Sequence, residues 1–281
     1  MTFIKRNQKP KVELCPIFYS LKIILNMVAD FFRFIVEDIA FNGSIYAFFV
    51  VPSFLIFWVI FKKKLAFLRI QPQQKAKIWH FLHDASHSFS TLVVFAFIDF
   101  GLYKAEKSGY TQIYYDISEY GIVWFVVSIV LMMILHDAYF YWTHRAMHSP
   151  SLYKYFHKVH HQSTDPSPFT SFAFHPLEAI VENGITMLFV FLMPISFTAL
   201  IIWQVLQQGF NMIGHLGYEV YPSWWLTHPL FKWKTPSTHH NMHHELFKGN
   251  YGLYFTWWDK WCGTEFKNYE SRYEQIFEQK K

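Results

Sequence analysis

Long apolar runs separated by charged stretches dominate the first two thirds of this chain and predict membrane-spanning helices. The run 44–61, SIYAFFVVPSFLIFWVIF, carries no charge and is followed by a Lys-Lys-Lys triplet. The runs 88–103 and 120–135 are also apolar, although Asp99 interrupts the first of them. These lengths approach the roughly 20 residues that cross ~30 Å of hydrocarbon as a helix. Each run is therefore expected to span a membrane.

A fourth apolar stretch, 179–210, is too long for a single span. Pro194 lies near its centre, and a proline inside a helical pattern ends or kinks the helix. We therefore expect a hairpin of two helices here. Residues 17–41 instead mix charged and apolar positions, which favours an amphipathic helix at the membrane interface. The pattern as a whole predicts an all-α integral membrane bundle with about four or five membrane helices.

The distribution of basic residues predicts how these helices are oriented. Loops rich in Lys and Arg stay on the cytoplasmic side, and the loop 62–87 holds six of them. The later crossings then return His136 and the C-terminal third to the same side. Residues 1–43 conflict with this assignment, because they also hold six Lys/Arg and a single span at 44–61 would place them outside.

Composition supports a membrane protein and excludes other classes. Of the 281 residues, 52% are hydrophobic and only 16% are charged, against about 25% charged in typical soluble domains. The net charge of +5 fits cytoplasmic loops and anionic headgroups better than nucleic acid, since no basic patch is interleaved with aromatics. Cys15 and Cys262 form no disulfide framework or metal spacing. The basic start lacks a small-residue cleavage site, so no removable signal peptide is expected.

Histidines then gather directly after the apolar run 120–135, in the segment HDAYFYWTHRAMH. On a helix that turns about 100° per residue, Asp137, His144 and His148 fall within about 40° of one another, with Tyr141 on the same stripe. His136 lies about 100° off that stripe. Histidines four residues apart can bind one metal ion from a single helix, and Asp137 is a candidate further ligand or orienting group.

Two further clusters repeat the spacing H-x-x-H-H. The three boxes together hold eight imidazoles, whereas a tetrahedral zinc takes about four ligands. Two ions are therefore the natural count, and imidazole alone does not distinguish iron, copper and zinc. The box histidines are His144 and His148, then His157, His160 and His161, then His240, His243 and His244, with His239 adjacent to the last group.

Other interpretations of these histidines are weaker. A lone histidine beside a membrane helix is usually an interfacial residue, but chance or pH sensing does not select H-x-x-H-H twice. Hydrolytic zinc is disfavoured because neither HHELF nor HPLEA completes H-E-x-x-H. His175, with Glu178 one turn later, and His215 are equally open to being ligands or supporting groups. Three more histidines near 88–103 fit an interfacial position: His80, His83 and His87.

Four segments carry a resemblance to a known family: HDAYFYWTHRAMH, HKVHHQSTDPSPFTSFAFHPLE, STHHNMHH and GNYGLYFTWWDKWCGT. Together they resemble the membrane-bound sterol desaturase/fatty acid hydroxylase superfamily over roughly residues 120–266. Three ordered histidine boxes followed by N-Y-G and W-D-x-x-x-G-T are a highly specific combination. The segment SPFTSFAFHPLE and the NYG…WD ending look most like the sterol C5-desaturase branch.

The resemblance implies a domain organisation and a metal centre. Together with the hydrophobic pattern, it divides the chain into an N-terminal interfacial segment (1–43), membrane helices (44–119), a catalytic domain (120–266) and a polar C-terminal tail (267–281). It implies a cytosolic histidine-rich cap that holds two metal ions, normally iron, with zinc able to replace iron in a purified sample. The implied ligands are the eight box histidines and His215, with His175 and His239 as further candidates; Asp137, Tyr141 and Glu178 are the candidate catalytic side chains.

The implied activity is oxidation of a lipid C–H bond with O2 and two external electrons. The sequence has no dinucleotide fingerprint, C-x-x-C-H haem site or iron–sulfur cysteine set. We therefore expect a separate donor, cytochrome b5-like or ferredoxin-like, at the cytoplasmic face of the endoplasmic reticulum or of a bacterial inner membrane. Desaturation of a sterol is favoured; hydroxylation of an acyl chain or other lipid is the first rival. A membrane metal-binding or transport protein without redox chemistry is the second.

Overall fold

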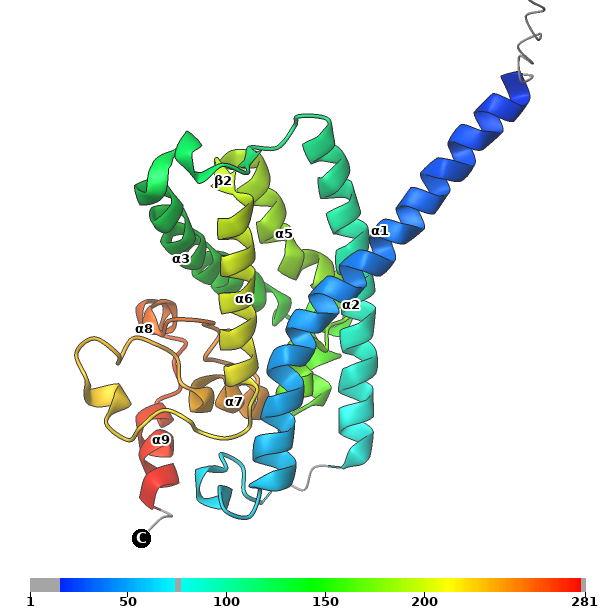
Figure 1. Cartoon of the computed structure of the whole chain (residues 1–281). Helices are drawn as coiled ribbons and strands as arrows, with labels where there is room; N and C mark the ends of the chain where they lie inside the picture. The colour runs from blue at the N-terminus through cyan, green and yellow to red at the C-terminus, as the bar shows by residue number, and fades with distance from the viewer. Residues whose placement is uncertain (1–15, 74–76, 279–281) are drawn as a thin grey trace, which may run out of the picture.

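The computed structural model describes residues 16–73 and 77–278, with side chains described from residue 24 onward. Parts of the expected N-terminal segment (1–15) and of the C-terminal tail (279–281), and Lys75 of the basic loop, lie outside the described residues. Helices dominate the described part (Figure 1), which confirms the predicted all-α architecture. One pair of two-residue strands is the exception, and it lies at the end of the bundle opposite the histidine boxes.

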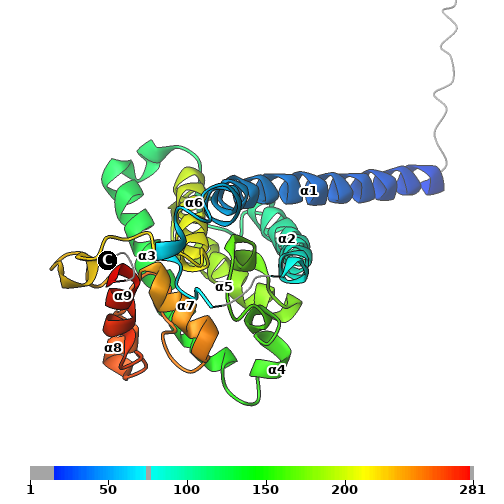
Figure 2. The same ribbon diagram turned by 90° about the horizontal axis from the view of Figure 1, so that it is seen from below.

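The first helix is longer than the sequence pattern suggested. α1 runs over Pro16–Ser53 and continues into a π-helical turn, η1, at Phe54–Ile60. The expected interfacial segment and the first expected span therefore form one continuous helix, without a break near residue 43. The wider turn follows Pro52, whose missing N–H removes one hydrogen bond from the α-helical ladder. The early part of α1 extends beyond the bundle (Figures 1 and 2).

Within the described residues, three helices are long and apolar enough to cross a membrane by themselves. They are Ile24–Ile60, which comprises most of α1 and η1, α2 (Ile78–Lys107) and α3 (Gly121–Met147). Many large apolar side chains on these helices are exposed, for example Val123 at 74% and Phe48 at 72%. Contiguous apolar surface of this kind requires a non-aqueous solvent. The protein is therefore an integral membrane protein.

The predicted hairpin is present as α5 (Pro176–Leu192) and α6 (Phe197–Gly214). Pro194 lies between the two helices, as expected. Strand β2 (Ile195–Ser196) follows it and pairs in parallel with β1 (Ile113–Tyr114), joining the hairpin turn to the connection between α2 and α3. That connection also holds the short 3-10 helix η3 (Ile117–Glu119).

The five long helices pack into one bundle around aromatic and aliphatic side chains. One group joins α3, α5 and α6 through Met132, Phe189 and Trp203. A second group joins α1 and η1 to the end of α6, with Val50 and Trp58 at its centre. Burial of such side chains contributes roughly 1.5–3 kcal/mol each. The bundle therefore brings the ends of α2, α3, α5 and α6 together at one pole.

The remaining segments form a cap at that pole (Figure 1). Figure 2, from below, shows α7 crossing it between α3 and α5. The tail expected after residue 266 contains α9, which buries Tyr269, Tyr273 and Ile276. These positions share one helical face, so the tail is amphipathic. The cap elements are η2 (Ala66–Leu68), α4 (Tyr153–Phe156), η4 (His160–Gln162), η5 (Pro168–Phe172), η6 (Trp225–Thr227), α7 (Ser237–Leu246), α8 (Trp257–Cys262) and α9 (Tyr269–Glu278).

Candidate metal centre

Nine histidine side chains converge where the bundle meets the cap. They separate into two groups, and within each group one potential ligand atom per residue lies within 4.8 Å of every other. We call them the five-ring cluster and the four-ring cluster. The five-ring cluster is His144, His148, His157, His161 and His243; the four-ring cluster is His160, His215, His240 and His244.

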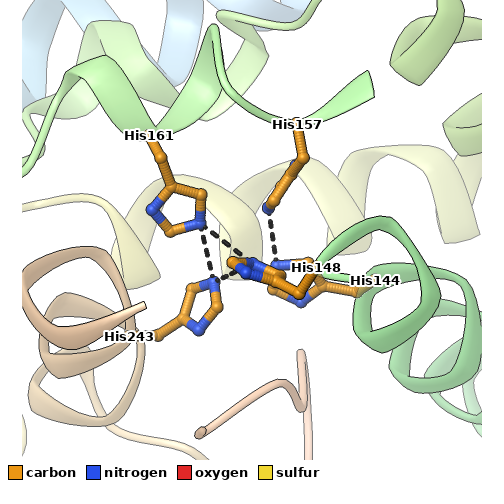
Figure 3. Close-up of side chains that lie close together, drawn as sticks. All are labelled: His144, His148, His157, His161 and His243. Atoms are coloured by element: carbon orange, nitrogen blue, oxygen red, sulfur yellow. Dashed lines mark hydrogen bonds between the residues drawn. The ribbon is translucent and has the colours of Figure 1, made fainter. Parts of the chain in front are cut away.

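The five-ring cluster is shown in Figure 3, where imidazoles from α3, the α4–η4 segment and α7 point toward one another. The Nε2 atoms of His144 and His157 are 2.9 Å apart. The Nε2 of His161 lies 3.1 Å from that of His148 and 3.0 Å from that of His243. Four of the rings are buried, and only His148 is partly exposed.

The four-ring cluster lies deeper, and all of its rings are buried. The Nε2 of His215, at the end of α6, is 3.2 Å from that of His160 and 3.0 Å from that of His240. The Nε2 of His244 has no hydrogen-bond partner among the described residues. A buried nitrogen without a partner is costly unless a ligand binds it.

Each H-x-x-H-H box contributes to both clusters. His157 and His161, four residues apart, join the five-ring cluster, whereas His160 joins the other. In the third box the assignment is reversed: His240 and His244 join the four-ring cluster, and the intervening His243 joins the five-ring cluster. Residues i and i+4 lie on one helical face, whereas residue i+3 points about 60° away from residue i and about 100° away from residue i+4. The clusters are adjacent, with the rings of His161 and His244 centred 4.7 Å apart.

Backbone carbonyls and one carboxylate orient five of the nine rings. Each of these five imidazoles donates from Nδ1, which leaves the Nε2 lone pair available for an ion, the arrangement usual around metal-bound histidine. The Nδ1 of His157 contacts Oε1 of Glu178. The carbonyl acceptors are Tyr251 O for His144 (2.9 Å), Gly249 O for His243 (2.7 Å), Ser163 O for His244 (2.9 Å) and Asn211 O for His215 (2.7 Å).

Burial keeps these imidazoles in the form that binds metals. It lowers the pKa of the six histidines in the second and third boxes well below the usual value of 6.5, and neighbouring imidazoles lower each pKa further. Neutral imidazole is the ligand form, because a protonated ring has no free lone pair. The two clusters offer neutral imidazole nitrogens, and the Nε2 of His244 has no hydrogen-bond partner among the described residues. This donor set fits two transition-metal ions, one in each cluster.

The three candidate catalytic side chains have different positions. Glu178, fully buried in α5, contacts His157 directly. The carboxylate of Asp137 instead accepts from the backbone N–H groups of Tyr254 and Phe255 and from the indole of Trp257. These three donors engage both oxygens of Asp137, and neither cluster includes it, so its position is that of a structural anchor for the C-terminal segment.

Tyr141 also serves this segment. Its hydroxyl lies 3.0 Å from Oγ1 of Thr264 and accepts from Arg145 at 3.1 Å. Two further candidates, His175 and His239, are in neither cluster. The Nδ1 of His175 accepts from the N–H of Leu177 and caps α5.

His239 is fully buried, 3.5 Å from Asp259 between Nε2 and Oδ2. Asp259 accepts from the N–H groups of Tyr251 and Gly252 and from the hydroxyl of Thr264 at 2.7 Å. It thereby holds the loop whose carbonyls orient His144 and His243. Sequence reasoning singled out the segment NYGLYFTWWDKWCGT but gave no role to Asp259.

Gly249 shows why this loop has its sequence. Its φ is +149°, and a Cβ there would lie 2.6 Å from the carbonyl oxygen of Thr264. A side chain would therefore displace the carbonyl that orients His243. The next residue, Asn250, has φ +54° and donates to the carbonyl of His239 at 3.0 Å.

Segments outside the histidine boxes hold the second box in place. Arg69, in the loop after η2, forms an ion pair with Asp165. Asp84, buried near the start of α2, accepts from the hydroxyls of Ser163 and Thr170, both at 2.6 Å. The segment that follows His161 is thus attached both to the loop after η2 and to α2. None of these supporting residues was predicted from the sequence.

A cavity of about 380 Å³ lies within the membrane-spanning bundle, and two of the side chains that line it pack against rings of the metal centre. Its walls come from α1, α2, α3, α5 and α6 and are mostly aromatic and aliphatic. Phe140 and Phe174 line it, and their rings are centred 4.9 Å from that of His144 and 5.2 Å from that of His160, respectively. The cavity therefore reaches side chains that contact both clusters, and its apolar wall suits a lipid.

Comparisons with known proteins agree with this architecture. The family model for fatty acid hydroxylase matches residues 129–264. A Delta(7)-sterol 5(6)-desaturase of Gibberella zeae is 31% identical over 77% of this chain and 64% of its own length. A Delta(7)-sterol 5(6)-desaturase of Aspergillus fumigatus is 32% identical over 79% of this chain and 71% of its own length.

Human lathosterol oxidase is 34% identical over 59% of this chain and 54% of its own length. The chain thus spans between about half and seven tenths of these relatives. No solved structure matches it. The relatives, the family model and the buried histidine clusters together lead to one assignment. This chain belongs to the sterol desaturase/fatty acid hydroxylase superfamily, in its sterol desaturase branch.

Proposed function

We propose that this protein is a membrane-bound lipid oxidase that holds two iron ions and uses O2 to introduce a double bond into a sterol-like lipid. The observation that carries the proposal is the convergence of nine imidazoles into two adjacent clusters, which pack against side chains that line a largely apolar cavity. The sterol desaturases and the lathosterol oxidase among the relatives support a sterol-like substrate. The comparisons give no support to the non-redox alternative.

The chain's own residues position the reaction. The box histidines and His215 would hold the two ions through Nε2, with Glu178 and the loop carbonyls fixing the rings. When bound, iron would supply the oxidation of an unactivated C–H bond by O2, which side chains alone cannot perform. The aromatic walls of the cavity exclude water and align the lipid body. Zinc could occupy the same imidazoles in a purified sample.

Desaturation removes two hydrogens from the lipid and requires two further electrons and two protons to reduce one O2 to two waters. We propose that a separate cytochrome b5-like or ferredoxin-like protein delivers these electrons. The exposed triplet Lys62, Lys63 and Lys64 follows η1 at the cap end of the bundle and supports docking of an acidic donor there. The positive-inside rule supports a cytoplasmic position for this face, in the endoplasmic reticulum or a bacterial inner membrane.

Hydroxylation is the second candidate. It is favoured by the match of the fatty acid hydroxylase model to residues 129–264. Hydroxylation uses the same O2 and the same two electrons, but one oxygen atom enters the lipid and one leaves as water. The product distinguishes the two reactions: a desaturase product has lost two hydrogens, and a hydroxylase product has gained one oxygen.

The proposal is tested with cells that express the wild-type chain or His160→Ala. Their lipids are compared by mass spectrometry, and purified protein is supplied with a Δ7-sterol, O2 and a reduced donor. We expect a desaturated sterol from the wild-type chain only. Product formation by His160→Ala, or turnover of the purified chain with a nicotinamide cofactor and O2 but no donor, would contradict the proposal.

A further inference from the structure

The cavity contains a group of polar side chains at the depth of the membrane helices. We call this group the polar girdle: Asp38, Asn42, Asp99, Glu182, Asn183 and Gln204. Its members come from α1, α2, α5 and α6, so four helices contribute to it. Polar groups at such positions are costly and are usually retained for a function. None of them belongs to the metal centre.

The girdle is incompletely satisfied by its own contacts. Asn42 donates to Asp38 at 2.9 Å, and Asn183 donates to Asp99 at 3.3 Å. The carboxyl group of Glu182 forms no hydrogen bond or ion pair with any residue that the structure describes. No Lys or Arg of the described residues lies within ion-pair distance of the three carboxyl groups. Acceptor oxygens therefore remain available to a hydrogen-bond donor inside the cavity.

A donor beside the girdle is also unpaired. Trp203 lines the same cavity next to Gln204 and is only 3% exposed. Its Nε1–H has no hydrogen-bond partner among the described residues, although buried indoles usually find one. The cavity thus offers free acceptors on carboxyl groups and a free donor on an indole. A hydroxyl group complements both, because it donates one hydrogen and accepts through its lone pairs, whereas an ammonium group only donates.

The girdle lies at a short, fixed distance from the metal centre along two helices. Glu182 follows Glu178, the partner of His157, by one helical turn, about 6 Å along α5. Gln204 precedes Asn211, whose carbonyl orients His215, by about 10 Å along α6. A group held at the girdle therefore places atoms several ångströms away beside the clusters.

We propose that the polar girdle binds the free hydroxyl of the lipid substrate and thereby selects which ring carbon faces the metal centre. This inference rests on the proposed function for the reaction, but the binding itself requires no turnover. Asp38, Asp99 and Glu182 accept the hydroxyl hydrogen directly or through the girdle amides, and Trp203 donates to its oxygen. The aromatic walls contact the apolar rings of the lipid and leave the hydroxyl to fix its register.

The experiment compares two probes, a Δ7-sterol with a free 3-hydroxyl and its methyl ether. The ether keeps the oxygen but has no hydrogen to donate. Each competes with a radiolabelled Δ7-sterol for the full chain, purified in lipid nanodiscs. The wild-type protein should bind the free hydroxyl about tenfold more tightly, a factor that one well-formed buried hydrogen bond can supply. The double variant Asp99→Leu/Glu182→Leu should bind the two probes within about threefold of each other.

Matched variants separate the girdle from general effects. Glu37→Leu changes an exposed acid next to Asp38 on α1 that does not line the cavity, and it should keep the tenfold preference. Glu182→Gln keeps an acceptor oxygen and should keep most of the preference. Thermal unfolding of each variant checks its fold, and leucine in place of a buried carboxyl leaves no uncompensated charge.

Equal binding of the two probes by the wild-type protein overturns the inference without reference to any variant. Loss of the preference in Glu37→Leu to the same extent as in the double variant also overturns it. Tighter binding of an amine-bearing sphingoid lipid than of the sterol would also overturn the inference, because it would show that the girdle binds a cationic group and not a hydroxyl. If the sterol and its ether are desaturated equally well, the girdle inference fails and the proposed desaturase function stands. If the protein prefers the free hydroxyl but forms an oxygenated product, the girdle inference stands and the proposed desaturase function fails.

Discussion

The two histidine clusters share the second and third boxes but differ in three respects. The five-ring cluster has one ring more than the other, and its His148 is partly exposed. Among the nine cluster imidazoles, His157 is the one that a carboxyl group, that of Glu178, orients, and it belongs to the five-ring cluster. The four-ring cluster is wholly buried, and the orienting groups seen in it are neutral carbonyls, at Asn211 and Ser163.

This difference indicates that the two positions are unequal as metal sites. The four-ring cluster has no spare ligand, since about four ligands complete a tetrahedral site. The five-ring cluster has a surplus ring and a carboxyl partner, Glu178, which orients His157 as a ligand. It is also the more open of the two, through His148. We therefore expect loss of one ligand to affect the four-ring cluster more.

The largest effect is expected from removing a ring from the four-ring cluster. His244→Ala should leave one ion per chain instead of two and abolish lipid oxidation, because three rings remain. His148→Ala should keep two ions and part of the activity, because four rings remain. Elemental analysis and product quantification measure both. His80→Ala, an exposed histidine outside both clusters, is the control. Equal metal loss in both cluster variants would contradict the asymmetry.

Acid tests the feature that the two clusters share. The six histidines of the second and third boxes have folded-state pKa values below the unfolded value of about 6.5. Their contribution to stability is therefore fully present above pH 6.5 and is lost as pH falls. Each histidine lowers the free energy of unfolding by up to about 1.4 kcal/mol for every pH unit below 6.5. Thermal unfolding of the metal-free protein between pH 7.5 and 5 should show a falling midpoint; a constant or rising midpoint would be inconsistent with buried neutral rings.

A smaller effect isolates the carboxylate of the five-ring cluster. Glu178→Gln keeps an oxygen that can accept from Nδ1 of His157 but removes the ionisable carboxyl group. Substitutions of such supporting groups typically cost about 10- to 100-fold in metal affinity or activity. Chelator titration should release one ion per chain at a correspondingly lower chelator concentration and leave the second ion unchanged. Simultaneous release of both ions would show that the clusters do not respond independently.

The smallest effect is expected from the loop that orients two rings of the five-ring cluster. Thr264 donates to Asp259, which holds the loop carrying the carbonyls of Gly249 and Tyr251. Thr264→Val keeps the side-chain shape and removes this hydrogen bond, at a cost of about 0.5–1.5 kcal/mol in stability. Metal affinity should fall by less than tenfold, and only at the five-ring cluster. Unfolding and chelator titrations measure both quantities, and weakening of the four-ring cluster instead would argue against this assignment of the loop.

Spacing along the sequence was informative where the ligands share one helix or one helical turn. The i, i+4 pairs His144/His148, His157/His161 and His240/His244 each stay together in one cluster, as their common helical face predicts. The same helical rotation grouped Asp137 with His144 as a candidate ligand or orienting group. Asp137 lies on the same side of α3 but seven residues earlier, about 10 Å along the helix. The angle around a helix says nothing about this axial separation, and the C-terminal segment supplies the partners of Asp137 instead.

His215 illustrates the opposite limit. It stands outside every box, so its spacing left its role open, and only the family resemblance implied that it is a ligand. Its position became clear only from packing: Gly214 at the end of α6 lies against the ring of His240, where a Cβ would already be in van der Waals contact at 3.5 Å and a bulky side chain would collide with the ring. His239, although adjacent to a box, faces Asp259 and lies in neither cluster. Proximity in sequence and proximity in space diverge at these two residues.

The amino-acid sequence alone determined the helical membrane architecture, the hairpin around Pro194 and a supply of imidazoles sufficient for two ions, because hydrophobic runs and short-range spacing act within single helices. Tertiary structure decided which cluster each imidazole joins, which carbonyls orient the rings and where the polar girdle faces the cavity. These features join residues such as His148 and His243, 95 positions apart, whose Nε2 atoms lie 3.1 Å from each other. Such distances depend on how whole helices pack, and no local pattern encodes them.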